Sequence, residues 1–127
     1  MAARVCTAVV AVALIAWLGV MERGVRLQAS GVEAAERHSW ARADEDFRRA
    51  RLLTPDTLPD VRRALVFQGS GRTGRALAVL DDVVRREPEN LAAWRFILAF
   101  AGDRDPALRR RALAAIRRLD PINARRL

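Results

Sequence analysis

Three equally spaced prolines constrain the fold of this chain more than any other feature. Pro55, Pro88 and Pro121 lie 33 residues apart. The apolar residues before them recur with the same period, at Phe47, Leu80 and Leu113 and at Ala50, Val83 and Ile116. A period of about 20 to 50 residues is typical of stacked supersecondary units, not of a single wound domain. The sequence therefore predicts an array of three repeats.

Each repeat is predicted to be a pair of helices. Before every proline, apolar residues lie three, four or seven positions apart, which is the spacing of one face of an α-helix. Proline cannot continue a helix interior, because it lacks the N–H and clashes with the preceding turn. The helix pairs are therefore expected at about residues 24–53, 58–86 and 90–119, with Asn90 and Asp105 as N-caps.

In these units the chain resembles the tetratricopeptide repeat family, whose second helix reads Ala-x3-Phe-x2-Ala-x4-Pro. That pattern is met in full by Ala43, Phe47, Ala50 and Pro55, and in a second copy by Ala76, Leu80, Val83 and Pro88. Trp94 stands six residues after Pro88, where the family has its tryptophan. The chain departs from the family in its shorter period, in Arg109 at an alanine position and in Val61 at a tryptophan position.

The resemblance covers residues 24–127 and implies a right-handed α-solenoid that binds proteins through an inner groove. It places Arg62 and Arg95 on the groove side of the first helices of the second and third pairs. Two stacked guanidinium groups there would bind a carboxylate-rich or C-terminal peptide. The alternative is that both are ordinary exposed arginines. Val66 and Ala99 stand where family members that grip acidic C-termini carry Asn.

The N-terminal segment, residues 5–21, contains no charged residue. Seventeen residues at 1.5 Å per residue approach the thickness of a hydrocarbon core. We therefore expect a membrane anchor at residues 1–22, a repeat domain at residues 23–127, and single-pass localisation in the cell membrane on an undetermined side. A cleaved signal peptide and a buried helix are the alternatives. The predicted fold class is thus all-α, with an N-terminal transmembrane helix before an α-solenoid of three helix pairs.

The charge of the chain is a net +8, and all 23 basic residues are arginine. This bias weakens an argument from charge to nucleic acid. The arginine clusters lack the interleaved aromatic residues that stack on bases, which argues against nucleic-acid binding. An acidic partner, an anionic lipid or a solvated face remains open for these clusters, which are Arg109–Arg111, Arg117–Arg118 and Arg125–Arg126.

The end of the array is expected to be a contact surface, because no capping element follows the last repeat. This surface is predicted near Leu108, Ala112, Ala115 and Leu119, and a second copy is one candidate to cover it.

A glycine motif, Gly-x-Gly-x-x-Gly, runs from Gly69 to Gly74. A dinucleotide site needs a strand before the glycines and an acidic residue about 20 positions later. Here the preceding pattern is helical, and residue 94 is tryptophan. We interpret the motif as a turn between helices, and we expect no catalytic residue, cofactor or metal.

The sequence thus favours a non-enzymatic, membrane-anchored scaffold that binds an unidentified protein through its groove. The first alternative is a small accessory subunit or assembly factor of a membrane or envelope complex. A nucleotide-binding enzyme at the glycine turn is a minor one.

Overall fold

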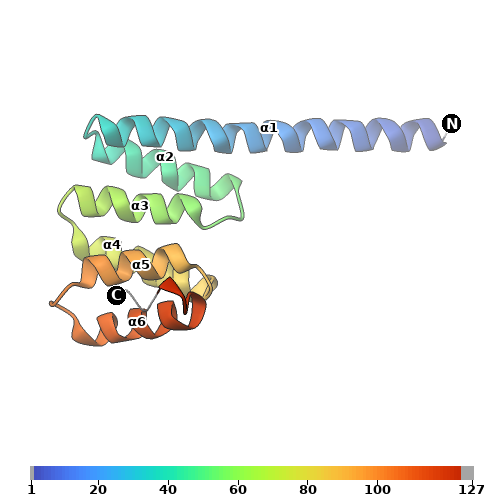
Figure 1. The fold of residues 1–127 in the computed structure, drawn as a ribbon. Coiled ribbons are helices and arrows are strands. Elements are labelled where there is room, and N and C mark those ends of the chain that lie inside the picture. Colours follow the sequence, from blue (N-terminus) through green and yellow to red (C-terminus); the bar gives the residue numbers. More distant parts are fainter. Residues whose placement is uncertain (1, 124–127) are drawn as a thin grey trace.

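The computed structural model describes the backbone of residues 2–123 and the side chains of residues 12–123. Over these residues the chain is all-α, with six helices and no strand (Figure 1). The helices are α1 (Ala2–Glu36), α2 (Trp40–Leu53), α3 (Leu58–Gly69), α4 (Thr73–Arg86), α5 (Leu91–Ala101) and α6 (Pro106–Leu119). Each helix packs on the one before and the one after, so three pairs stack into an α-solenoid.

Helix α1 continues from the apolar N-terminal segment into the first pair without interruption. Its C-terminal part packs on α2 through a close contact between Gly31 and Phe47. A Cβ atom at residue 31 would lie 2.8 Å from Cε1 of Phe47, so only glycine admits the ring at this distance. Helix α1 ends near His38, which takes a φ of 58° before the chain reverses.

The expected transmembrane helix is a wrong prediction. No helix in the described part of the chain is both long and apolar enough to cross a membrane. Over the residues with described side chains, the uncharged part of α1 ends at Met21. Glu22, Arg23 and Arg26 follow it directly. Single-pass membrane localisation therefore loses its support. Of the predicted span, the side chains of residues 5–11 lie outside the described ones.

The apolar core is divided between the two ends of the solenoid. A small cluster joins the first three helices and contains Ala34, Ala43, Phe47 and Val66. A larger cluster runs through α3 to α6 and includes Trp94, with Leu80, Ile97 and Ile116 among its most enclosed members. The indole Nε1 of Trp94 donates to the carbonyl oxygen of Pro88 at 2.9 Å, so the one polar atom of that side chain is satisfied.

Polar contacts tie the first two pairs together. The buried carboxylate of Asp60 accepts from Arg51 Nε at 2.9 Å and from an Arg86 guanidinium nitrogen at 2.6 Å. The buried hydroxyl of Thr57 donates to Glu87, and the Asn90 amide donates to the same carboxylate oxygen at 2.9 Å. These hydrogen bonds hold the pKa of Glu87 below its usual value of 4.5, with the Thr57 hydroxyl as the main cause. The turns after α2 and α4 are thereby joined.

The far end of the solenoid differs from the expected contact surface. The four residues predicted to face outward instead pack into the core against α5, namely Leu108, Ala112, Ala115 and Leu119. The positions that would meet a further repeat are Arg109, Leu113 and Arg117. Their equivalents in α4 are all buried, namely Ala76, Leu80 and Val84. The reason is that α4 packs on both α3 and α5, whereas the extensive contacts of α6 within the described residues are with α5 alone. Arg125 and Arg126 lie outside the described residues.

Candidate partner-binding groove

A groove between α1 and α3 is bordered by two predicted site residues, Arg62 and Val66. Two hollows, of about 510 and 270 Å³, share Val32, Glu36 and Arg62 and so form one continuous groove. Val25 and Leu65 add exposed apolar surface, with 67% and 40% of their areas accessible. From Val25 to Glu36 the groove follows α1 for about 16 Å, the length of three helical turns.

The groove exists because α1 carries two apolar stripes. One stripe, which includes Gly31 and Ala34, is buried against α2. The other places Val25 and Val32 seven residues apart, on a second face that no helix of the described chain covers. Val32 is 38% exposed, an arrangement that leaves apolar surface open to a partner.

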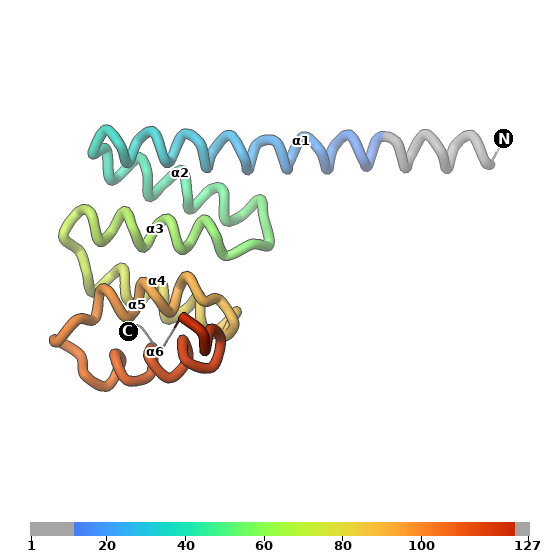
Figure 2. Tube along the Cα trace, viewed as in Figure 1, coloured from blue at the N-terminus to red at the C-terminus, as the bar shows by residue number. Residues whose placement is uncertain are grey.

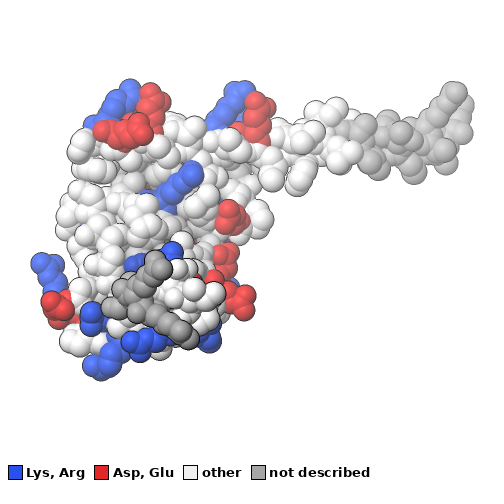
Figure 3. Space-filling view, viewed as in Figure 1, with Lys and Arg blue, Asp and Glu red and all other residues white. Residues whose placement is uncertain are grey.

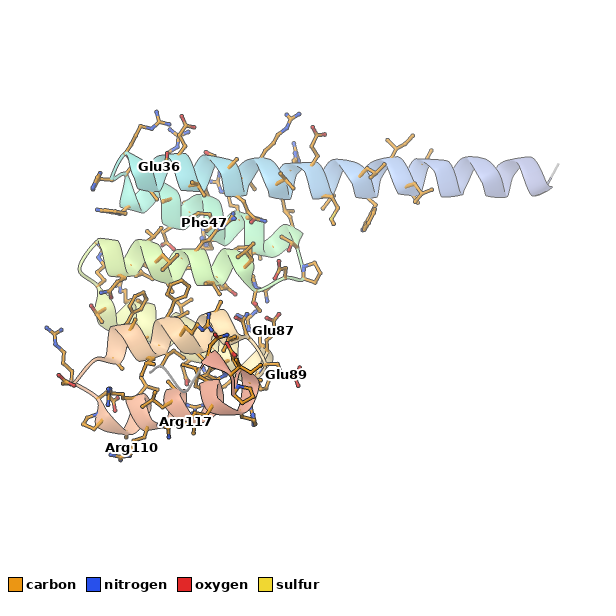
Figure 4. The ribbon with its side chains drawn as sticks, viewed as in Figure 1. Glu36, Phe47, Glu87, Glu89, Arg110 and Arg117 are labelled. Carbon is orange, nitrogen blue, oxygen red and sulfur yellow. The ribbon has the colours of Figure 1, made fainter. Side chains whose placement is uncertain are left out.

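Arg62, a predicted site residue, lies in this groove. Its guanidinium donates to Oε1 of Gln28 on α1 at 2.8 Å. Because a guanidinium has five N–H donors and Gln28 occupies one of them, donors remain for a carboxylate of a partner. The side chains of Glu33 and Glu36 lie on the α1 rim, and Figure 4 shows Glu36 near the end of that helix.

Val66, the second predicted site residue on α3, forms part of the groove floor. Only 3% of its area is exposed, and it packs with Phe47 and Ala34. A valine here gives an apolar floor in place of the amide that would grip a peptide backbone. Trp40 borders the same hollow from α2.

Arg95 and Ala99 lie elsewhere on the solenoid, on α5. Arg95 is exposed and donates to Asp120 Oδ2 at 2.7 Å. Hydrogen bonds from Asn123, and the Arg95 guanidinium after them, hold the pKa of Asp120 below its usual value. Ala99 is exposed. Arg95 is thus engaged with the end of its own repeat, whereas Arg62 contacts the groove wall, so the two arginines have different surroundings.

The glycine motif forms the connection between α3 and α4. Gly69 is the last residue of α3 and faces the ring of Trp40, 2.9 Å from where a Cβ would stand. Gly71 takes a φ of 76°, a left-handed conformation that side chains other than glycine disfavour. A helix precedes these glycines, where a dinucleotide site has a strand. Within the described residues, no group of three or more His, Cys, Asp or Glu side chains could hold a metal.

Two other hollows carry arginine. One, of about 640 Å³, lies between α1 and α2 and is bordered by Arg23, Arg26 and Arg49. Arg26 and Arg49 are already paired, with Glu22 at 2.6 Å and with Glu45 at 2.7 Å. The other lies on α6 beside Trp94. Neither hollow contains any of the four residues predicted for the partner-binding groove, which are Arg62, Val66, Arg95 and Ala99.

The groove residues on α1 were not predicted from the sequence. The signal for them was the spacing of Val25 and Val32, which repeats the apolar face two turns later. The sequence alone does not show which of two apolar faces of this helix is buried, the one with Val25 and Val32 or the one with Gly31 and Ala34. The contact between Gln28 and Arg62 joins residues 34 positions apart, and it follows from the packing of α1 and α3.

Comparison with known proteins adds no family to this description, since no protein-family model, no curated protein and no solved structure matches the chain.

Proposed function

We propose that this chain is a non-enzymatic interaction module of the tetratricopeptide-repeat kind, which binds a segment of another protein in the groove between α1 and α3. The observation that carries the proposal is the exposed apolar surface of Val25, Val32 and Leu65 around the Arg62 guanidinium. The 33-residue repeat and the solenoid support it, because α-solenoids present extended concave surfaces to partners.

The groove favours a partner with both apolar and acidic side chains. Apolar residues of the partner would cover Val32 and Leu65, and a carboxylate would take the free donors of Arg62. Three helical turns are long enough for an amphipathic helix, which anchors through residues three, four and seven positions apart.

Photo-crosslinking tests this proposal. Benzoylphenylalanine at residue 65 is expected to form a discrete adduct in the cells that make the protein. The matched control has the same group at residue 78, an exposed alanine position on α4. Addition of Arg62→Glu should remove most of the adduct. Equal adducts from both positions, or an adduct indifferent to Arg62→Glu, would contradict the proposal.

A second candidate function is that of an accessory subunit held permanently in a larger protein assembly. Helix α1 favours it, because Val12, Ile15, Trp17 and Leu18 are each at least 59% exposed (Figure 2 shows this part of α1 extending beyond α2). A helix that is apolar on all sides is normally buried. Stoichiometric co-purification with one larger protein, lost on Ile15→Glu, would favour this function over transient binding.

A further inference from the structure

Helix α6 carries most of the uneven charge of the described chain. It contains five arginines and no acidic residue. In each of the other helices, the numbers of arginine and acidic residues with described side chains differ by one. The excess positive charge is therefore concentrated at one end of the solenoid.

Four of the five arginines of α6 are also unpaired in the described part of the chain, whereas most arginines of the first helix pair make ion pairs with acidic residues. Within the described residues, Arg109, Arg110, Arg117 and Arg118 are exposed and make no ion pair or side-chain hydrogen bond. On α1 and α2, by contrast, the arginines with described side chains other than Arg23 make ion pairs, as Arg48 does with Glu45 at 2.6 Å. Figure 3 shows blue beside red along α1, and several blue side chains together at the lower end of the solenoid.

The arginines of α6 are spaced to meet more than one carboxylate. Arg110 and Arg117 lie seven residues apart, as do Arg111 and Arg118, so each pair is separated by about 10 Å along the helix. Figure 4 shows Arg110 and Arg117 on α6 at the lower end of the solenoid. The small, exposed Ala114 lies between the two pairs in sequence and leaves room for a ligand.

A hollow of about 380 Å³ adjoins these arginines, bordered by Trp94, Arg111, Ala114, Ala115 and Arg118. Arg111 is held in place, because its guanidinium donates to Asp81 Oδ1 at 2.9 Å and lies 5.2 Å from the centre of the Trp94 ring. Arg118 has no such partner within the described residues and is available to a ligand in the hollow.

We infer that the face of α6 formed by Arg110, Arg111, Ala114, Arg117 and Arg118 docks an acidic segment of another protein. One carboxylate of that segment enters the hollow beside Arg118. Further carboxylates pair with Arg110 and Arg117, in charge-assisted hydrogen bonds that are stronger than neutral ones.

Two other occupants, a second copy of the chain and nucleic acid, fit this face less well. A two-fold contact between copies through α6 would set these arginines against one another. Nucleic acid fits less well, because the aromatic ring that borders the hollow, that of Trp94, is buried and so presents no open face on which a base could stack. The Trp94 ring already lies beside Arg111.

Fluorescence anisotropy of a labelled polyglutamate peptide with the full chain tests this inference. Arg110→Glu together with Arg117→Glu is expected to weaken binding at least about tenfold, from the loss of two charge-assisted contacts. Ala114→Glu, which leaves every arginine in place but puts a carboxylate among them, should weaken it similarly. The matched control is Arg72→Glu together with Arg75→Glu, two exposed arginines outside α6 that are also unpaired in the described chain. This control should change the affinity less than about threefold.

Three results would overturn the inference. The first is equal weakening by the control, which would mean that net charge alone binds the peptide. The second is unchanged affinity in both α6 variants while circular dichroism shows them folded. The third is tighter binding of a labelled DNA duplex that is lost in the same variants, which would assign the face to nucleic acid. Leu65→Glu in the groove should leave polyglutamate binding unchanged, so failure here is separate from failure of the proposed function.

Discussion

Phe47 in α2 and Leu113 in α6 occupy equivalent positions of the repeat but have opposite environments. Phe47 is 2% exposed and fills the space beside Gly31, whereas Leu113 is only partly buried and lies outside the core cluster. The sequence pattern is the same at both places. The difference comes from the neighbours, because α2 has a helix on either side and α6 packs mainly on α5. Repeat position determines which way a side chain faces, and the next repeat determines whether it is buried.

The arginines of the first helix pair and those of α6 also differ, in whether acidic residues engage them. In the first pair, most arginines with described side chains are engaged by acids on the same helix, and the carboxylate of Glu45 is shared by Arg48 and Arg49. The hydrogen bond from Arg48 is the main reason that the pKa of Glu45 is below its usual value. In α6, Arg109 and Arg117 stand where the second pair has the buried apolar residues Ala76 and Val84, and they give the array a polar end, which terminal repeats need for solubility.

The largest expected effect is the difference in stability loss between alanine substitutions at Phe47 and at Leu113. Phe47→Ala removes a buried ring next to a glycine that cannot fill the space, and should lower the free energy of unfolding by about 3–5 kcal/mol. Leu113→Ala should lower it by less than about 1 kcal/mol, because little apolar area is lost. Urea denaturation of both variants measures the contrast. Similar losses would mean that the last pair is packed as tightly as the first.

The second prediction concerns the buried ion pairs between the first two repeats. Asp60→Asn leaves Arg51 and Arg86 without their shared carboxylate and should cost about 2 kcal/mol, less than fully buried pairs because both guanidinium groups reach solvent. Asp120→Asn, which loses the exposed contact to Arg95 in the last pair, should cost less. Thermal unfolding at low and high salt provides the comparison, and an equal cost at both positions would refute it.

The third prediction is a pH dependence of the contact between Thr57 and Glu87, which joins the turns after α2 and α4. Glu87 has a lowered pKa, so its contacts stabilise the folded state above the unfolded pKa of about 4.5 and are lost as the pH falls through the folded value. At pH 7, Thr57→Val should destabilise the protein by about 1 kcal/mol. The difference between the two proteins should shrink as the pH falls below about 4.5. A difference that stays constant across this range would show that Thr57 acts through packing and not through Glu87.

The smallest effect on stability is expected at the open end. Arg109→Ala with Arg117→Val introduces the residues of the second repeat, Ala76 and Val84, and should change the free energy of unfolding by less than about 0.5 kcal/mol. It should nevertheless cause concentration-dependent association, because an apolar face replaces the polar end. Sedimentation equilibrium distinguishes the variant from the parent. A variant that stays in the same state as the parent at all concentrations would show that the arginines do not act as a cap.

Local pattern was enough to predict the helix pairs. The second and third were placed at residues 58–86 and 90–119, and the structure has Leu58–Arg86 and Leu91–Leu119. Both predicted caps are confirmed, since Asn90 accepts from the Ala93 N–H at 3.0 Å and Asp105 accepts from the Leu108 N–H at 2.9 Å. Helix periodicity, caps and prolines act over a few residues, so one sequence carries them in full.

Features that depend on distant helices were not predicted. The outward face of α6 was assigned to the wrong residues, because its amphipathic pattern has apolar residues on two sides and only the contact with α5 selects one of them. The groove was predicted through Arg62, but its α1 wall was missed, since Gln28 meets Arg62 through tertiary packing. The membrane prediction was based on the uncharged residues 5–21, whereas no helix in the described part of the chain is long and apolar enough to cross a membrane.

The most direct test of a binding groove between α1 and α3 is a peptide-library selection against the full chain, followed by measurement of each enriched peptide on variants. We expect most of these peptides to lose binding to Leu65→Glu, to keep it with Ala78→Glu, and to carry apolar residues with an acidic one among them. Peptides that bind Leu65→Glu as well as the parent, but fail to bind Arg110→Glu with Arg117→Glu, would place the main binding surface on α6 and contradict the account.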